Sequence, residues 1–286
     1  MATCTLLKDT WRHDTRTGRR STLYALHTLH TGWKGARVIG VLGGMGPLAT
    51  ADFFAKVIAA TDAQDDAGHV PLLIHSDPRI PGRPAALLHG GASPLPALLA
   101  ARDRLIAAGA QGLVMACNTA HYWHARLREG CALPFPSIVD VACAQAAQRF
   151  GSGARIGLVA TRATLATRLF EPALRAHGLS LLAPTDAALD QWILPAIALV
   201  KAGNLKDAGP LLDRAVQDML DASADGIILA CTEAPMALQA APAAPHARCI
   251  DSSTALAQAT VALWREIQGS QSNLHTRPEP ATSPLP

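Results

Sequence analysis

The sequence predicts an α/β protein built from two related units, each with a parallel sheet, and two observations carry this prediction. Short apolar strands alternate with helical stretches between residues 37 and 268, as in parallel sheets covered by helices on both faces. In addition, the stretch "GLVMACNTAH" (112–121) returns as "GIILACTEAP" (226–235), so that Cys117 corresponds to Cys231. The repeat indicates two units related by approximate two-fold symmetry.

In the first unit, apolar runs define the strands, and glycines or prolines separate them from the helices. "GGMG" (43–46) follows the first strand, and a Pro-rich loop is expected over 78–94. The expected strands are 38–42, 69–77, 112–116 and 136–141, and the expected helices are 48–61, 95–109, 118–129 and a last one ending near Phe150.

The second unit begins at "ARIGLVATRAT" (154–164), which resembles "ARVIGVLGGMGPLAT" (36–50). Pro195 predicts a kink or break in the helix over 189–204. The other expected elements are a strand and a turn within 154–164, a helix beginning near Leu165, a strand over 179–185, an amphipathic helix over 205–224, strands at 226–230 and 247–254, and a helix over 255–268.

These patterns predict domain limits. We expect 37–135 plus 245–268 to form the first α/β domain and 136–244 the second. Residues 1–36 have no clear periodicity and are expected to be a disordered or non-core extension. Residues 269–286 are rich in Pro, Ser and Thr and are expected to be a disordered tail.

Composition excludes several classes of function. Hydrophobic residues make up 49% of the 286 residues, and the formal net charge of +3 is too small to indicate nucleic-acid binding. No apolar run approaches the roughly 20 residues that span a bilayer. Six dilute cysteines without an obvious secretory signal favour reduced thiols in a cytoplasmic protein. Cys117 with His121 offers too few ligands for a zinc site.

The glycine turn at 43–46 lacks the G-x-G-x-x-G spacing of a dinucleotide site. Its glycines still let backbone N–H groups approach an anion at the start of the following helix. A carboxylate fits such a turn as well as a phosphate does.

Cys117 and Cys231 each end a strand, and ligands of these folds bind at the carboxyl ends of strands. A single cysteine would be interpreted as a small buried hydrophobe, but a pair in equivalent positions indicates catalysis. Thr119 and Thr232 follow at expected helix starts, and a helix N-terminus favours thiolate over thiol. If the two units face each other, both thiols face one cleft.

Other polar residues have two interpretations each. His121 is either a base for Cys117 or a surface histidine. Arg79 and Arg83 are either solvated or held by a stiff loop for bidentate binding of a carboxylate. Lys201 either serves the substrate or stabilises a helix C-terminus.

The motifs "GGMGPLAT", "SDPRIPGR", "CNTAH", "KAGN" and "CTE", in this order, resemble the cofactor-independent aspartate/glutamate racemase superfamily, and most closely its aspartate racemase branch. The resemblance covers about residues 37–268. It implies two pseudo-symmetric Rossmann-like domains with parallel sheets and an interdomain cleft, a homodimer, and no cofactor. It also implies that Cys117 and Cys231 are the two acid/base residues.

The resemblance further implies roles for the residues around the cysteines. Arg83 would hold the distal carboxylate of a dicarboxylic amino acid, with help from Lys201. The residues expected to bind the rest of the substrate are Met45, Gly46, Asn118, Thr119, Thr161 and Thr232. Leu48, Ala163 and Ala230 depart from residues frequent in the family.

Racemisation removes the α-hydrogen from one face and returns a proton to the other, so two groups on opposite sides suit it. The expected activity is therefore a racemase for aspartate, and possibly glutamate, that works without pyridoxal phosphate. Maleate isomerisation or arylmalonate decarboxylation on the same scaffold is the alternative reaction. A protein that binds an amino acid without turnover is the non-enzymatic alternative.

Overall fold

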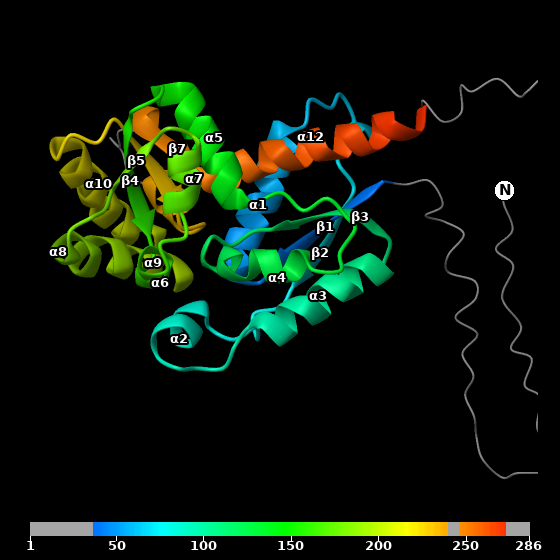
Figure 1. Ribbon diagram of the computed structural model, residues 1–286, viewed down its shortest axis with the longest axis horizontal. Helices are drawn as coiled ribbons and strands as arrows, with labels where there is room; N and C mark the ends of the chain where they lie inside the picture. Colours follow the sequence, from blue (N-terminus) through cyan, green and yellow to red (C-terminus); the bar gives the residue numbers. More distant parts are fainter. Residues whose placement is uncertain (1–36, 240–245, 273–286) are drawn as a thin grey trace, which may run out of the picture. The chain divides into compact units, whose positions relative to one another are not determined.

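The structure, a computed structural model, describes residues 37–239 and 246–272, which lie in one compact unit (Figure 1). It contains two parallel sheets. In the first, β1 (Val38–Gly43) lies between β2 (Leu72–Ser76) and β3 (Ala110–Met115). In the second, β4 (Arg155–Ala160) lies between β5 (Ser180–Leu182) and β6 (Gly226–Ala230), and β7 (Cys249–Asp251) follows β6.

The two sheets repeat one order: an edge strand, a central strand and the strand that precedes a cysteine. Both central strands carry a glycine at a crowded point. A Cβ at Gly40 would lie 2.9 Å from Leu113 Cδ2, and one at Gly157 would lie 2.5 Å from Ile227 Cδ1. Glycine there lets the strand approach its neighbour's side chains. The predicted α/β fold with two parallel sheets is confirmed.

Helices connect the strands. In the first half these are α1 (Pro47–Ala60), η1 (Asp66–Gly68), α2 (Arg83–Leu88), α3 (Leu95–Ala107), η2 (Thr119–Trp123) and α4 (His124–Arg128). In the second half they are α5 (Ile138–Phe150), α6 (Arg162–Ala166), α7 (Glu171–Ala176), α8 (Asp186–Ala188), η3 (Leu189–Ile193), α9 (Leu194–Lys201), α10 (Leu205–Asp221), α11 (Ala234–Gln239) and η4 (His246–Arg248).

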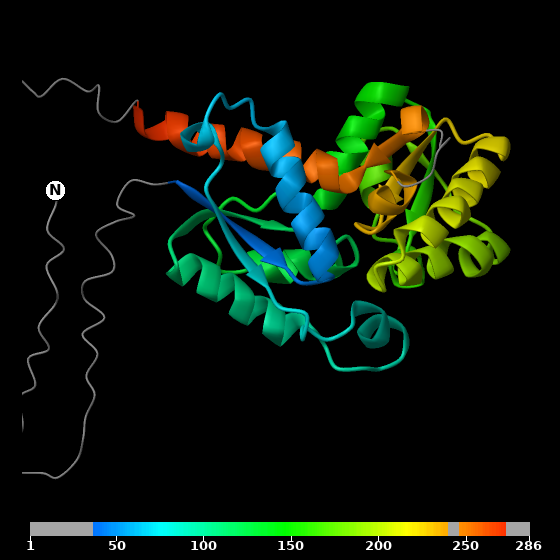
Figure 2. The same cartoon turned by 180° about the vertical axis from the view of Figure 1, so that it is seen from behind.

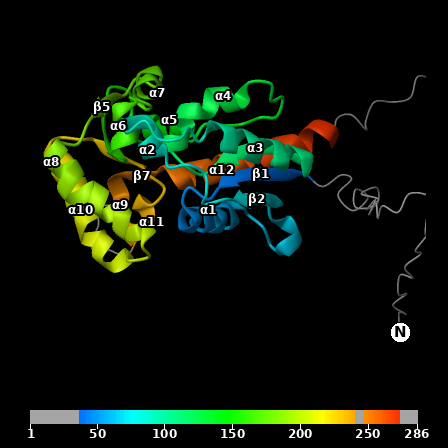
Figure 3. The same ribbon diagram turned by 90° about the horizontal axis from the view of Figure 1, so that it is seen from below.

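The last helix, α12 (Ser252–Ser272), contacts both halves. It packs against α1 and β3 of the first half and against α5 of the second, and Figures 2 and 3 show it running from one half to the other. One apolar cluster accordingly includes strand residues from both sheets, among them Val41 and Leu158. The halves therefore share part of their core.

The segment 136–141, expected as a strand, is instead the start of α5. Ser137 caps this helix by accepting a hydrogen bond from the N–H of Asp140, which lies in the first turn. The preceding segment runs beside β3, where Leu113 N–H donates to Pro134 O. Local capping thus outweighs the strand preference of the β-branched residues Ile138, Val139 and Val141.

Several other expectations change in detail. The loop 78–94 contains α2, whose first turn accepts Pro84. A kink or break was expected at Pro195, but the π-helical turn η3 runs directly into α9, and Pro195 is accommodated in the first turn of α9. β7 was assigned to the first domain but pairs with β6 of the second sheet, and α12 continues to Ser272, past the predicted start of the tail.

Residues 1–36 and 273–286 lie outside the described residues, and the domain limits stay a prediction. Within the described part of the chain, no helix is both long and apolar enough to cross a membrane.

Candidate active site

A narrow cavity lies between the two halves. Nine of the ten predicted site residues line it, together with Pro84 and Glu233: Met45, Arg83, Cys117, Asn118, Thr119, Thr161, Lys201, Cys231 and Thr232. The tenth, Gly46, lies beside it, since a Cβ at this position would be 3.6 Å from Glu233 Oε1. Both thiols therefore open onto one cavity.

The glycine turn after β1 forms one wall. Gly44 has a φ of +86°, and a Cβ there would lie 2.3 Å from the backbone nitrogen of Asp77. Thr50, in the first turn of α1, accepts from Gly44 N–H (2.9 Å) and donates to Gly46 O (3.0 Å) through its hydroxyl. The start of α1 thus fixes the turn that carries Met45 and Gly46.

Cys117 follows β3 after one residue and is buried. His121 does not act on its sulfur. His121 Nδ1 donates to Cys117 O (2.8 Å), and its Nε2 accepts from Ile138 N–H (3.1 Å). Burial lowers the pKa of His121 to about 3. His121 is therefore a neutral, buried histidine that ties the cysteine turn to α5, neither a base for Cys117 nor a surface residue.

Cys231 follows β6 directly, and its thiol donates to Glu233 Oε2 (3.1 Å). Burial, followed by the charge of Glu233, raises the pKa of Cys231 well above its ordinary value. The expectation that a helix start would favour the thiolate is therefore wrong for Cys231. The helix that follows, α11, has only six residues, so its dipole is small beside desolvation and the carboxylate at 3.1 Å.

Glu233 is the acidic residue of the cavity and is 3% exposed. Its Oε2 also accepts from the Thr232 hydroxyl (3.3 Å). Its Oε1 has no hydrogen-bond partner among the described residues, and Lys201 Nζ lies 3.8 Å from it. The sequence motif "CTE" contained Glu233, but sequence reasoning gave it no role.

Asn118 is anchored to the second half. Its Nδ2 donates to Ser252 Oγ (2.9 Å), which in turn donates to Leu229 O (2.7 Å). Its Oδ1 is buried and has no hydrogen-bond partner among the described residues. This leaves an acceptor available at the cavity wall.

Three threonine hydroxyls form a closed triangle across the boundary between the halves. Thr119, after β3, lies 3.0 Å from Thr161 and 2.8 Å from Thr164, and the latter two are 3.0 Å apart, all measured between Oγ1 atoms. Thr161 caps α6 by accepting from Thr164 N–H. Thr164 was not expected to take part; it does not line the cavity but holds two residues that do.

The cationic residues occupy different positions. Arg79 is exposed and pairs with Asp77 through two hydrogen bonds, so it is a surface residue. Arg83 is buried, and it donates to the carbonyls of Ile80, Pro81 and Met45 (3.1 Å each).

These three bonds differ from the bidentate carboxylate site expected for Arg83. The Nε of Arg83 has no partner among the described residues. Lys201 ends α9 and also lines the cavity, and its role toward a substrate stays a prediction.

Comparisons with known proteins show the family that this chain matches. Residues 42–260 match the family model described as Asp/Glu/Hydantoin racemase. The broad specificity amino-acid racemase RacX of Bacillus subtilis is 24% identical over 81% of this chain and 100% of its own length.

Among solved structures, the aspartate racemase of Picrophilus torridus has a TM-score of 0.70 and 28% identity, and the match covers 80% of this chain and 94% of that one. An aspartate racemase homologue from Pyrococcus horikoshii has the same fold, with a TM-score of 0.63, 22% identity and coverage of 80% and 99%.

Proposed function

Because the chain belongs to the Asp/Glu/hydantoin racemase family, we propose that it is a racemase of a dicarboxylic amino acid in which Cys117 and Cys231 exchange the α-proton. The observation that carries the proposal is that two buried thiols, one from each half of a repeated fold, line a single cavity. A carbon held between them is open to proton transfer from opposite faces.

In one direction, the thiolate of Cys117 removes the α-hydrogen as a proton, and the C–H electron pair stays on the substrate as a carbanion. The thiol of Cys231 then gives its proton to the opposite face of that carbon and becomes a thiolate. The hydrogen bond of the Cys231 thiol to Glu233 and its raised pKa support its role as the initial acid.

In the other direction, Cys231 must start deprotonated. Glu233 Oε2 already accepts the hydrogen bond of this thiol and is therefore positioned to take its proton. While Glu233 is ionised, its charge adds to burial in keeping the pKa of Cys231 high, so Cys231 can act as a base only after Glu233 has taken its proton. Because the two sulfurs supply both the proton acceptor and the proton donor, we propose that no cofactor is needed.

Polar atoms of the cavity that have no hydrogen-bond partner among the described residues support a substrate that carries both an ammonium group and carboxylates. Asn118 Oδ1 and Glu233 Oε1 are buried acceptors that suit an ammonium group. Arg83 Nε and the ammonium of Lys201 are donors that suit carboxylates. The hydroxyls of Thr119, Thr161 and Thr232 can stabilise the charge that spreads into the α-carboxylate as the carbanion forms.

Within this class we propose aspartate as the preferred substrate and glutamate as the weaker one. The cavity is narrow, and one extra methylene in a fitted pocket changes discrimination by about 1–3 kcal/mol. The test is circular dichroism of single L-amino acids incubated with the protein freed of pyridoxal phosphate. Loss of the aspartate signal, faster than that of glutamate and absent with neutral amino acids, is the expected result.

The mechanism is tested by following deuterium incorporation at the α-carbon in D₂O. Cys117→Ser and Cys231→Ser should each abolish racemisation, and each should retain exchange with at most one enantiomer. If both variants racemise aspartate and glutamate like the parent, the two-thiol mechanism is wrong. Retention of activity by one variant alone would favour a reaction that needs a single cysteine, such as isomerisation of maleate.

A further inference from the structure

The start of α12 contains two residues that are typical helix caps, Asp251 and Ser252, and only the first of them caps the helix. The carboxylate of Asp251 accepts from Ser253 N–H (2.8 Å) and from the Thr254 hydroxyl (2.6 Å). A serine at a helix start commonly bonds to the backbone of its own first turn. Because Asp251 satisfies this turn, the Ser252 hydroxyl is available for partners outside α12.

The Ser252 hydroxyl lies between two groups that are distant in the sequence. It donates to Leu229 O in β6 (2.7 Å), and it accepts from Asn118 Nδ2, after β3 (2.9 Å). Ser252 is fully buried and does not line the cavity, whereas Asn118 is 2% exposed and lines it. Ser252 can therefore act on the cavity only through Asn118.

The direction of these two hydrogen bonds is fixed at the Leu229 end. A carbonyl can only accept, so Leu229 O receives the single proton of the Ser252 hydroxyl. The hydroxyl then has only lone pairs to offer to Asn118, and the NH₂ group of the amide is the group that can donate to them. The opposite amide orientation would set oxygen against oxygen with no hydrogen between them. Asn118 Oδ1 is thus held on the side of the amide that faces away from Ser252.

We propose that Ser252 is a positioning residue that fixes the Asn118 amide so that its oxygen, and not its NH₂ group, is presented to the α-ammonium group of the substrate. The identity of this ligand rests on the proposed function. Asn118 Oδ1 and Glu233 Oε1 are both buried without a hydrogen-bond partner among the described residues, so each half supplies one acceptor. An NH₂ group turned toward the ammonium would oppose donor to donor.

Ser252→Ala removes both hydrogen bonds and leaves the amide free to rotate. Because a hydrogen bond to a charged group is stronger than a neutral one, KM for aspartate should rise roughly tenfold or more. The ammonium keeps its charge while the α-proton moves, so the bond serves the bound substrate and the transition state alike. The value of kcat should therefore change less than KM.

Succinate distinguishes the orientation of the amide from a general loosening of the cavity. It has the two carboxylates of aspartate but no ammonium group. Its inhibition constant in Ser252→Ala should stay within about threefold of the parent value, although KM for aspartate rises. Equal weakening of aspartate and succinate would overturn the proposal.

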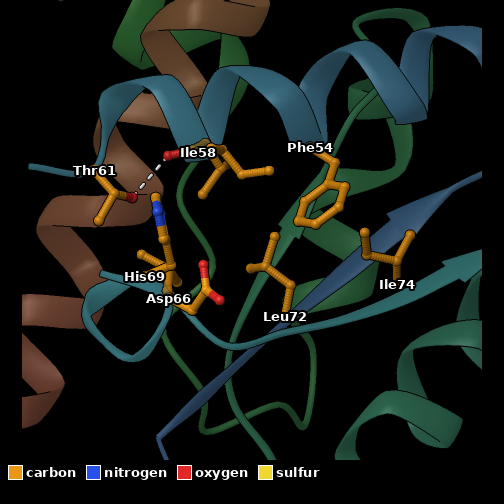
Figure 4. A pocket seen from close by; sticks show the side chains of 9 residues that line it. Phe54, Ile58, Thr61, Asp66, His69, Leu72 and Ile74 are labelled. Carbon is orange, nitrogen blue, oxygen red and sulfur yellow. Dashed lines mark hydrogen bonds between the residues drawn. The ribbon is translucent and has the colours of Figure 1, made fainter. Parts of the chain in front are cut away.

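The matched control is Thr61→Val, which also removes a buried hydroxyl that donates to a backbone carbonyl. Thr61 follows α1 and donates to Val57 O (2.7 Å), and Figure 4 shows this bond in the groove between α1 and β2. Thr61 does not line the cavity between the halves. Both variants should lose stability in urea, but Thr61→Val should keep the parent's KM for aspartate. A raised KM in both variants would assign the effect of Ser252→Ala to stability alone.

Hydrogen exchange of the side-chain amides, followed by NMR, tests the inference without any activity. Asn204 is the reference, because its NH₂ group donates to Asp207 at an exposed site. In the parent, the Asn118 NH₂ group should exchange roughly 100-fold or more slowly than that of Asn204, and Ser252→Ala should remove this protection.

Equal exchange of the two amides in the parent would overturn the role of Ser252 even in an active racemase. A slow Asn118 amide that Ser252→Ala releases, in a chain that does not racemise aspartate, would support the role of Ser252 and contradict the proposed function alone. Circular dichroism verifies that the variants fold, and the exchange measured in the parent does not depend on them.

Discussion

Removing the Thr164 hydroxyl tests whether the threonine triangle holds the two halves in the geometry that the cavity needs. Thr164→Val keeps the shape of the side chain but removes two hydrogen bonds, to Thr119 (2.8 Å) and to Thr161 (3.0 Å). Thr164 is 1% exposed, so water does not replace them. At about 0.5–1.5 kcal/mol each, their loss should lower the free energy of unfolding by about 1–3 kcal/mol.

The assay pairs urea denaturation with racemase kinetics, and Thr164→Ser is the control. Serine keeps the hydroxyl and loses one buried methyl group, which costs about 1 kcal/mol of stability. Both variants should therefore be less stable than the parent, but only Thr164→Val should change kcat or KM, because only it loosens Thr119 and Thr161 in the cavity wall. Equal kinetics for the two variants would refute the positioning role.

Three further predictions concern the cavity and its supports. Glu233→Gln removes the carboxylate that raises the pKa of Cys231, so iodoacetamide should alkylate Cys231 faster than in the parent at the same pH, whereas racemisation should slow. An alkylation rate equal to that of the parent would show that Glu233 does not control the pKa of the Cys231 thiol. The pKa of His121 is about 3 in the folded chain and near 6.5 in the unfolded chain, so protons bind preferentially to the unfolded chain as the pH falls. The contribution of neutral His121 to the free energy of unfolding should be complete above about pH 6.5 and should fall by several kcal/mol toward pH 3. His121→Gln should flatten that slope in urea titrations, and a slope equal to the parent's would assign the loss to other groups. Gly44→Ala should abolish activity and destabilise the fold, because the new Cβ would lie 2.3 Å from the Asp77 backbone. A melting temperature and a turnover number equal to those of the parent would show that the turn can relax.

The sequence predicts the scaffold well because the scaffold depends on local patterns. Buried parallel strands are nearly continuous apolar runs, as in β1 and β6, and the repeat of such a run before Cys117 and Cys231 locates both thiols on equivalent strands. The one strand that was predicted wrongly, at 136–141, had a local signal as well: Ser137 and Asp140 have the spacing of a helix cap.

The chemistry of the site is less predictable because it depends on distances between residues and on burial. Sequence spacing places Thr232 and Glu233 after Cys231, but only the fold brings Glu233 Oε2 to 3.1 Å from the sulfur. Similarly, a stiff loop predicts a fixed guanidinium at Arg83, yet three nearby carbonyls, rather than open space, surround its terminal nitrogens. Thr164 lies in none of the five motifs on which the family resemblance rests.

The helix α12 constrains the relative position of the two thiols, because it is packed against both halves. It is packed against α1 on one side and α5 on the other, so pulling the halves straight apart would strip one of these contacts. At the start of α12, Asn118 of the first half donates to Ser252, and Ser252 donates to the carbonyl of Leu229 in the second sheet, so two hydrogen bonds reinforce this connection. A change in the separation of Cys117 and Cys231 would therefore have to strain the packing of α12 or break one of these two bonds, so this helix also limits how far the two sulfurs can move apart.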